Sequence, residues 1–387
     1  MKKFLALLLA LVMSLSLVAC GGGSDTTTDE STDAEGDTSE NATYQVAMIT
    51  DYGDITDQSF NQTTYEACQE FCDAEGLQFE YYKPAGDSTA ERVAQVDAAV
   101  ADGYNVIVMP GYAFAETIKQ TAELYPDVTF IALDVAQGDL DPNGEGYTLP
   151  SNVYCAVYQE ELCGYMAGYA AVKLGYKHLG VLGGMAVPAV QRFGYGFVQG
   201  ADAAAVEMGI ADQVVMEYVY GNQFYGDADI TAYMDNWYQT LGVQVVFASG
   251  GGIYTSAAEA AAKVGGKLIG VDVDQSANID TYGEGMCVTS AMKGLAETVK
   301  HMLSEVLAGN FANYGGKIET LGLVSGDDPT ANYVQLPMET TQWGDGFTQD
   351  DYKALVKAMF DGEVTVSNDT SAMPETTITV NFAGNIK

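Results

Sequence analysis

The strongest constraint on the fold of this chain is a regular alternation of short apolar runs with segments of helical periodicity. We expect helices to begin near residue 59 and to cover residues 92–101, 115–124, 160–174, 194–208, 230–241 and 254–264. Buried strands are expected at 45–50, 77–82, 105–110, 128–134, 178–183, 213–220, 243–248 and 267–271. Strands that are apolar throughout are typical of parallel sheets covered by helices on both faces. The pattern therefore predicts an α/β protein with two doubly wound sheets.

The charge of the chain excludes several classes of partner. Its 387 residues include 53 Asp and Glu, 16 Lys and Arg and 2 His, which gives a formal net charge of −37. Because such a surface repels the phosphate backbone, we exclude nucleic acid as a partner. The scarcity of histidine argues against His-based catalysis and against a His-rich metal site. Since 48% of the residues are hydrophobic, the chain can still bury a substantial core.

The N-terminus has the features of an export signal. Lys2 and Lys3 precede an apolar run that is too short to span a bilayer and that ends in Leu-Val-Ala-Cys at 17–20. This ending resembles a bacterial lipobox, so we expect residues 1–19 to be a lipoprotein signal peptide and Cys20 to be lipidated. The alternative is an ordinary export signal with an incidental cysteine. Residues 20–43 hold seven acidic residues and no basic one, which predicts a disordered acidic tether.

The other five cysteines are expected to be small buried apolar residues. Cys68 and Cys72 lie four positions apart in an expected helix, where parallel Cβ vectors disfavour a disulfide. Neither a Cys-x-x-Cys pair nor a nearby histidine supports a zinc site. The remaining three are Cys155, Cys163 and Cys287.

The fold class also indicates where a ligand would bind, because doubly wound sheets bind ligands in the loops that follow the carboxyl ends of their strands. Here these loops combine aromatic rings, carboxylates and glycines, with scarcely a cation. Aromatic faces bind flat rings, and carboxylates accept pairs of hydrogen bonds from vicinal hydroxyls. The loops therefore predict a neutral, polyhydroxylated ligand that carries a base. They include Asp57, Phe60, Asn61, Asp134, Phe193, the segments 220–227 and 249–252, and Asp272.

Several short motifs in this region follow one another in a specific order. They are Asp-Gln-Ser-Phe-Asn-Gln at 57–62, Gly-Tyr-Met-Ala-Gly at 164–168, the glycine-rich segment 193–200, Ser-Gly-Gly at 249–251, Gly-Val-Asp-Val-Asp-Gln at 270–275 and Ser-Ala-Met-Lys at 290–293. In order and spacing they resemble the basic membrane lipoprotein family, the substrate-binding lipoproteins of ABC transporters for purine nucleosides. The first and fifth motifs are the most specific. The resemblance covers most of residues 44 to about 366.

The resemblance implies a type I periplasmic-binding-protein fold, in which two α/β lobes are joined by three crossings of the chain. Lobe one would contain residues 44–155 and about 276–312. Lobe two would contain residues 156–275 and about 313–387. The segment 270–275 would be one of the crossings.

The resemblance also implies roles for individual residues. Phe60 would stack on one face of the base, and an aromatic residue of the segment 220–227 would stack on the other. We favour Phe224 for the second position, with Tyr220 and Tyr225 as alternatives.

The polar contacts implied by the resemblance centre on the sugar. Asp134 would contact the ligand from lobe one, Asp272 would bind the ribose 2′ and 3′ hydroxyls, and Lys293 would balance these carboxylates. The base or the sugar edge would be contacted by Asp57 and Asn61, and Gly250 would let the backbone approach the ligand. Structural roles stay open at this point: Ser59 is a natural helix cap, Phe60 could belong to the core and Lys293 could extend to solvent.

Together these features predict a non-enzymatic receptor, with no catalytic residue, metal or cofactor. It would be held at the cell membrane by a lipid anchor, facing outside the cytoplasm. There it would capture a purine nucleoside and deliver it to the permease and ATPase of an ABC transporter. One alternative is a binding protein for a free sugar such as ribose or galactose. A nucleoside hydrolase is disfavoured because the aspartates at 51, 54 and 57 lack the downstream Glu of a calcium loop. A surface antigen or signalling receptor without a transporter is a further alternative.

Overall fold

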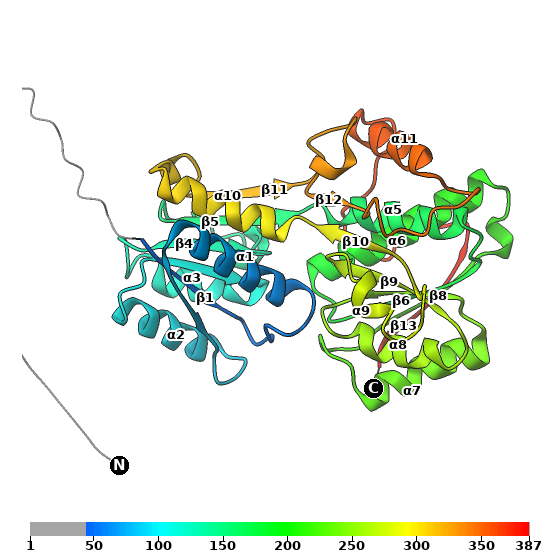
Figure 1. Ribbon diagram of the computed structural model, residues 1–387, viewed down its shortest axis with the longest axis horizontal. Coiled ribbons are helices and arrows are strands. Elements are labelled where there is room, and N and C mark those ends of the chain that lie inside the picture. Colours follow the sequence, from blue (N-terminus) through cyan, green and yellow to red (C-terminus); the bar gives the residue numbers. More distant parts are fainter. Residues whose placement is uncertain (1–43, 387) are drawn as a thin grey trace, which may run out of the picture. The chain divides into compact units, whose positions relative to one another are not determined.

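The computed structural model describes residues 44–386 (Figure 1). The expected signal peptide, the lipidated Cys20 and the acidic tether lie outside these residues. Within the described range, none of the helices combines the length and the apolar character needed to cross a membrane.

The first sheet has six parallel strands in the order β11-β5-β4-β3-β1-β2. Its strands are β1 (Gln45–Ile49), β2 (Gln78–Tyr82), β3 (Val106–Pro110), β4 (Thr129–Leu133), β5 (Val153–Tyr158) and β11 (Lys317–Leu321). The helices around it are α1 (Phe60–Glu75), α2 (Thr89–Ala101), α3 (Ala115–Thr121), α4 (Gln137–Leu140) and α10 (Leu295–Leu307). We call this sheet and these helices the first lobe.

The second sheet has seven strands in the order β12-β10-β9-β8-β6-β7-β13, and only the short β12 is antiparallel to its neighbour. Its strands are β6 (His178–Gly183), β7 (Val215–Tyr220), β8 (Val245–Ser249), β9 (Lys267–Asp272), β10 (Cys287–Lys293), β12 (Val334–Gln335) and β13 (Thr379–Asn385). The helices around it are α5 (Glu160–Lys173), α6 (Pro188–Glu207), α7 (Ala228–Asn236), α8 (Tyr254–Ala262), α9 (Ser276–Ile279) and α11 (Gln349–Phe360). We call this sheet and these helices the second lobe.

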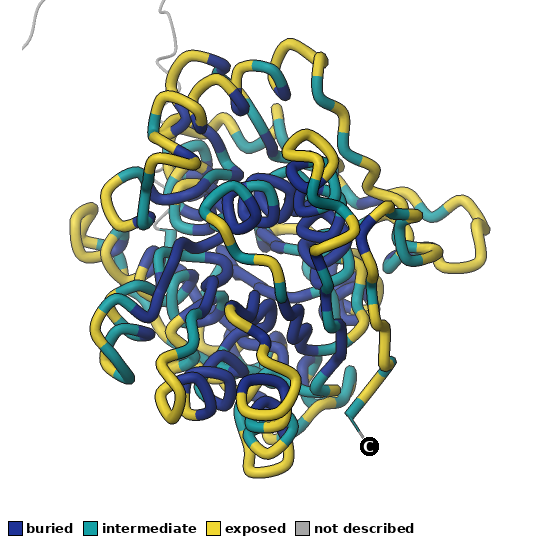
Figure 2. The backbone as a smooth tube through the Cα atoms, turned by 90° about the vertical axis from the view of Figure 1, so that its right-hand side faces the viewer, coloured by how far each residue is buried: buried dark blue, intermediate teal, exposed yellow. Residues whose placement is uncertain are grey.

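The central strands of both sheets are buried on both faces, as their continuous apolar sequences predict, whereas the edge strands β2, β11 and β13 are partly exposed. In β1, Val46 and Met48 pack with residues of α1 and α10, whereas Ala47 and Ile49 pack with residues of α2 and α3. Figure 2 shows the same arrangement as dark blue backbone in the interior and yellow backbone at the periphery. The five cysteines at 68, 72, 155, 163 and 287 are free and buried, which confirms their expected role as core residues.

Helices α5 and α6 approach each other unusually closely, and the glycine motifs explain why. A Cβ atom on Gly168 would lie 2.1 Å from the carbonyl oxygen of Phe197, and one on Gly200 would lie 2.0 Å from that of Tyr165. The backbones of the two helices are therefore in direct contact. A Cβ atom on Gly196 of α6 would lie 2.2 Å from the carbonyl oxygen of Glu161, so the first turn of α5 also packs directly against α6.

The chain passes between the sheets after Tyr158, after Lys293 and after Leu321. These points differ from the expected boundaries at 155, 275 and 312. Strand β10 pairs with β9 in the second sheet, so the segment 276–293 belongs to the second lobe and the segment 270–275 is not a crossing. Local periodicity identifies strands but does not indicate which sheet each strand joins.

The three crossings are hydrogen-bonded to one another. The backbone N–H of Gln159 donates to the carbonyl of Leu321 at 2.9 Å, that of Tyr333 donates to Gly322 at 3.0 Å, and that of Gly294 donates to Tyr333 at 2.7 Å. The three connections therefore lie side by side as one hinge.

Candidate ligand-binding site

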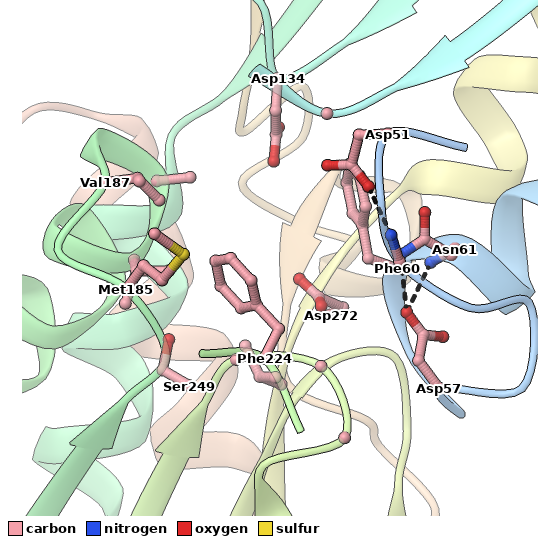
Figure 3. Close-up of a pocket in the computed structure, with 18 of the residues that line it drawn as sticks. Asp51, Asp57, Phe60, Asn61, Asp134, Met185, Val187, Phe224, Ser249 and Asp272 are labelled. Carbon is pink, nitrogen blue, oxygen red and sulfur yellow. Dashed lines mark hydrogen bonds between the residues drawn. The ribbon is translucent and has the colours of Figure 1, made fainter. Parts of the chain in front are cut away.

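A cavity of about 850 Å³ is lined by the loops at the carboxyl ends of both sheets (Figure 3). The structure brings together on its wall all eight residues that the sequence assigned to a ligand. They are Asp57, Phe60, Asn61, Asp134, Phe224, Gly250, Asp272 and Lys293. Their places on the wall agree with the expected site, while their roles toward a ligand stay predictions.

Lys293 is the electrostatic centre of this cavity. It ends β10, and its side chain is only 3% exposed. Its ammonium nitrogen lies 2.6 Å from Asp134 Oδ2 and 3.6 Å from both Glu160 Oε1 and Asp272 Oδ1. Burial alone lowers the pKa of Lys293, but Asp134, Asp272 and Glu160 outweigh burial and raise it. Lys293 is therefore a buried cation and does not extend to solvent.

Asp134 and Asp272 flank this ammonium from the two lobes. Asp134 follows β4, and Asp272 is the last residue of β9. The second oxygen of Asp134, Oδ1, is buried and has no hydrogen-bond partner. Asp272 Oδ2 accepts a hydrogen bond from the Ser59 hydroxyl at 2.6 Å. Burial raises the pKa of Asp272, against the opposing effects of Lys293 and Ser59.

Two charged residues of the site were missed by the sequence analysis. Glu160 starts α5 and is fully buried, and its Oε2 accepts from Arg192 Nε at 2.6 Å. Burial raises the pKa of Glu160, against Arg192 and Lys293, which both lower it. Arg192 lines the cavity.

Arg192 was missed because the expected start of its helix was too late. Helix α6 begins at Pro188, six residues before the expected start at 194, because proline is favourable in the first turn of a helix. Arg192 is one of only two arginines in the chain, and it directly precedes the Phe193 motif. This rarity is the signal that could have identified it. Phe193 itself is a buried residue of α6 and not part of a loop.

The two aromatic residues expected to stack on the base of the ligand enter the cavity from different lobes. Phe60, the first residue of α1, lies with its ring centroid 4.6 Å from the ammonium nitrogen of Lys293. Phe224 follows β7 and points into the cavity between Met185 and Asp272 (Figure 3). Its ring centroid lies 6.3 Å from that of Tyr52 of the first lobe.

The alternatives to Phe224 are placed elsewhere. Tyr220 is 2% exposed, and its hydroxyl lies 3.1 Å from that of Tyr218 in the core. Tyr225 is 64% exposed. Two glycines make room for Phe224: a Cβ atom would lie 2.5 Å from its ring at Gly184 and 3.3 Å at Gly250. A Cβ atom on Gly250 would also lie 2.8 Å from the backbone of Gly184, so close packing requires a glycine there.

Asp57 and Asn61 are hydrogen-bonded to each other. Asp57 accepts from the backbone of Ser59, Asn61 and Gln62, and its Oδ2 accepts from Asn61 Nδ2 at 3.0 Å. Asp57 therefore caps α1, and the Ser59 side chain does not cap it. Burial raises the pKa of Asp57, although these hydrogen bonds lower it. Asn61 Oδ1 is buried without a hydrogen-bond partner, so it is a free acceptor on the wall.

Asp51 is a further carboxylate on the wall. Its Oδ1 accepts from the backbone of Tyr52 at 2.6 Å and of Gly53 at 2.9 Å, and burial raises its pKa against these bonds. The carboxylate lies against Gly111, where a Cβ atom would be 2.5 Å from Asp51 Oδ2. Among the described residues, no three of His, Cys, Asp and Glu are grouped so that they could hold a metal ion.

Comparison with known protein families gives one clear match. The sequence model of a family described as "ABC transporter substrate-binding protein PnrA-like" matches residues 44–327. A CD4+ T-cell-stimulating antigen of Listeria innocua is 27% identical, over 82% of this chain and 87% of the relative. Basic membrane protein B of Borreliella afzelii is 27% identical, over 73% of this chain and 79% of the relative. The ABC transporter nucleoside-binding protein BmpA of Lactococcus lactis is 25% identical, over 83% of this chain and 88% of the relative.

Solved structures show the same fold. A solute-binding protein of an ABC transporter from Aeropyrum pernix superposes with a TM-score of 0.63 at 24% identity, over 84% of this chain and 88% of that protein. A second solute-binding protein, from Conexibacter woesei, gives a TM-score of 0.64 at 24% identity, over 84% of this chain and 99% of that protein. These similarities confirm the type I periplasmic-binding-protein fold.

Proposed function

Because the chain belongs to the PnrA-like family of ABC transporter substrate-binding proteins, we propose that it captures a purine nucleoside in its cavity and delivers it to a permease. Proteins of this family bind solutes and are not enzymes. The observation that carries the proposal is the buried Lys293 with an aspartate from each lobe, next to aromatic rings that also come from both lobes.

The carboxylates around Lys293 support recognition of a ribose. Vicinal hydroxyls donate pairs of hydrogen bonds to carboxylates, as in ribose recognition by dinucleotide-binding proteins. Asp134 Oδ1 is a buried acceptor without a partner, and such a group is costly unless a ligand or water donates to it. Lys293 would balance the charge of the two carboxylates and donate to the sugar.

The aromatic residues support recognition of a base. Phe60 and Phe224 would enclose it, and each stacking contact contributes about 1–3 kcal/mol. Asn61 Oδ1 and the Asp51 carboxylate are acceptors on the first-lobe side, where they could bind the N–H groups of a purine edge. The name of the Lactococcus relative, a nucleoside-binding protein, agrees with this assignment.

The charges of the wall support a neutral ligand. Seven aspartates line the cavity, against the cations Lys83, Arg192 and Lys293. Arg192 is paired with Glu160, and Lys293 is paired with Asp134, so neither offers an uncompensated positive charge. We infer that the cavity disfavours the phosphate of a nucleotide.

The sequence supports a location at the outer face of the membrane. The lipobox-like ending at Cys20 would supply a lipid anchor, and the acidic segment that follows would let the body move beside its permease.

Isothermal titration calorimetry of the purified protein tests the proposal. The titrated compounds are guanosine, inosine, adenosine, cytidine, the 2′-deoxynucleosides, guanosine monophosphate, ribose and galactose. We expect heat from the purine nucleosides and much weaker binding of the 2′-deoxynucleosides and of guanosine monophosphate. Binding of ribose or galactose with indifference to the base would support the sugar receptor instead. The absence of heat with every nucleoside would refute the nucleoside assignment.

A further inference from the structure

Two consecutive residues of the first lobe, Gln58 and Ser59, make three hydrogen bonds to the second lobe. The Tyr254 hydroxyl donates to Gln58 Oε1, and Gln275 Nε2 donates to the Gln58 carbonyl at 3.0 Å. The Ser59 hydroxyl donates to Asp272 Oδ2 at 2.6 Å. The three partners lie at the start of α8, next to the start of α9 and at the end of β9.

All three hydrogen bonds join protein groups directly and need no ligand. Ser59 and Gln275 are fully buried, and Tyr254 is 2% exposed. Gln275 Oε1 already accepts from the backbone N–H of Val271 at 2.9 Å, so the orientation of its amide is fixed and its Nε2 faces Gln58. Separation of the lobes would break these bonds together.

The first-lobe side of this contact is held in place before it meets the second lobe. Gln58 has a backbone φ of 54°, which residues other than glycine rarely adopt. Asp57 fixes this turn by accepting from the backbone of Ser59, Asn61 and Gln62, and Gln62 Oε1 accepts from the Gln58 N–H at 3.1 Å. Because Asp57 caps α1, the Ser59 hydroxyl stays available for Asp272.

We propose that Gln58 and Ser59 form an interlobe latch, which holds part of the unliganded protein in the closed conformation. The latch closes the cavity on the side of the Phe60 helix, and it places the Asp272 carboxylate against the first lobe before a ligand arrives. Ligand binding then shifts the equilibrium between the open and closed conformations further toward the closed one, which the latch already stabilises. This inference does not depend on which ligand the cavity takes.

The test measures the closed fraction without ligand. Spin labels on Ala101→Cys in α2 and Asn236→Cys in α7 report the distance between the lobes, since both positions are exposed and all five cysteines of the described chain are buried. In this background Tyr254→Phe removes one donor and keeps the ring. Tyr233→Phe, which removes a hydroxyl from α7 outside the cavity, is the matched control.

We expect the unliganded parent to show two label-to-label distances, one for the closed and one for the open conformation. Tyr254→Phe should lower the closed-to-open ratio roughly fivefold, as for one lost hydrogen bond. Ser59→Ala should act in the same direction, and Tyr233→Phe should match the parent. Thermal melting checks that each variant is folded. A parent that is entirely open without ligand, or a closed fraction unchanged in both Tyr254→Phe and Ser59→Ala, would overturn the latch. A failure to bind nucleosides would leave this result unaffected.

Discussion

Asp134 and Asp272 occupy equivalent positions in the two sheets. Asp134 follows β4, which lies between β3 and β5, and Asp272 ends β9, which lies between β8 and β10. Both have left-handed backbones, with φ of 60° and 66°, and both face the Lys293 ammonium. Aspartate tolerates this conformation better than most residues, but it is still strained. The two lobes thus bring the same strained carboxylate to one shared cation.

Lys293→Met should destabilise the protein strongly. It would leave Asp134, Asp272 and Glu160 buried together without the cation that they share, and breaking a buried pair in this way costs about 3–5 kcal/mol. Urea denaturation would measure the free energy of unfolding. Lys357→Met, which breaks an exposed pair with Asp361, should cost less than about 1 kcal/mol. Equal losses for the two variants would contradict the central role of Lys293.

Glu161→Gln should stabilise the protein at high pH. Burial raises the pKa of Glu161 to about 7 in the folded state, so the fold favours the protonated form. Its contribution to stability is present below the unfolded pKa of about 4.3 and is lost as pH rises toward 7.

The free energy of unfolding of Glu161→Gln should therefore match that of the parent near pH 4. At pH 8 it should exceed the parent's by roughly 3–4 kcal/mol, the equivalent of the difference of just under three pKa units between the folded and unfolded states. Denaturant titrations at both pH values would measure this difference. Glu123→Gln, on the exposed surface, is the control. If the free energies of unfolding of parent and variant differ by the same amount at both pH values, a raised pKa of Glu161 does not explain the difference.

Phe60→Ala and Phe224→Ala should each weaken nucleoside binding by about tenfold or more, because each removes one stacking face worth about 1–3 kcal/mol. Ribose alone should bind these variants and the parent equally. Calorimetry with inosine and ribose would compare them, and Phe360→Ala, at a half-exposed position, is the control. Equal losses for the nucleoside and the free sugar would show that the rings do not contact a base.

Gly168→Ala should destabilise the contact between α5 and α6. The new Cβ atom would lie 2.1 Å from the carbonyl oxygen of Phe197, so the helices would have to separate, at a cost of about 1–3 kcal/mol or more. Gly138→Ala has no atom within 4 Å of the new Cβ and should change stability little. Thermal unfolding compares the two variants. A harmless Gly168→Ala would mean that the helices adjust their spacing freely.

The sequence was sufficient for the fold class and for the cavity wall. Strand periodicity located β6 at its observed bounds, and the motifs placed Phe60, Asp272 and Lys293 around one cavity. The motifs that hold these three residues carry this information because they lie at or directly after the carboxyl ends of strands, where the loops of both sheets meet.

Other features depend on contacts that a linear pattern does not contain. Glu160 could not be paired with Arg192 from the sequence, because the pairing depends on the close packing of α5 and α6. Ser59 is a natural cap in sequence, yet Asp57 caps α1 and the Ser59 hydroxyl bonds to Asp272 in the other lobe. The crossings were misplaced because strand pairing decides them.

The hinge has a consequence for how the protein opens. Gln159, Gly294 and Gly322 belong to the three different crossings, and backbone hydrogen bonds link these crossings through Leu321 and Tyr333. A torsional change in one connection must be accommodated by the other two, so we expect them to bend in concert. Opening would then follow a single rotation between two discrete states, and the orientation of the lobes would be the feature by which a permease distinguishes the closed receptor from the open one.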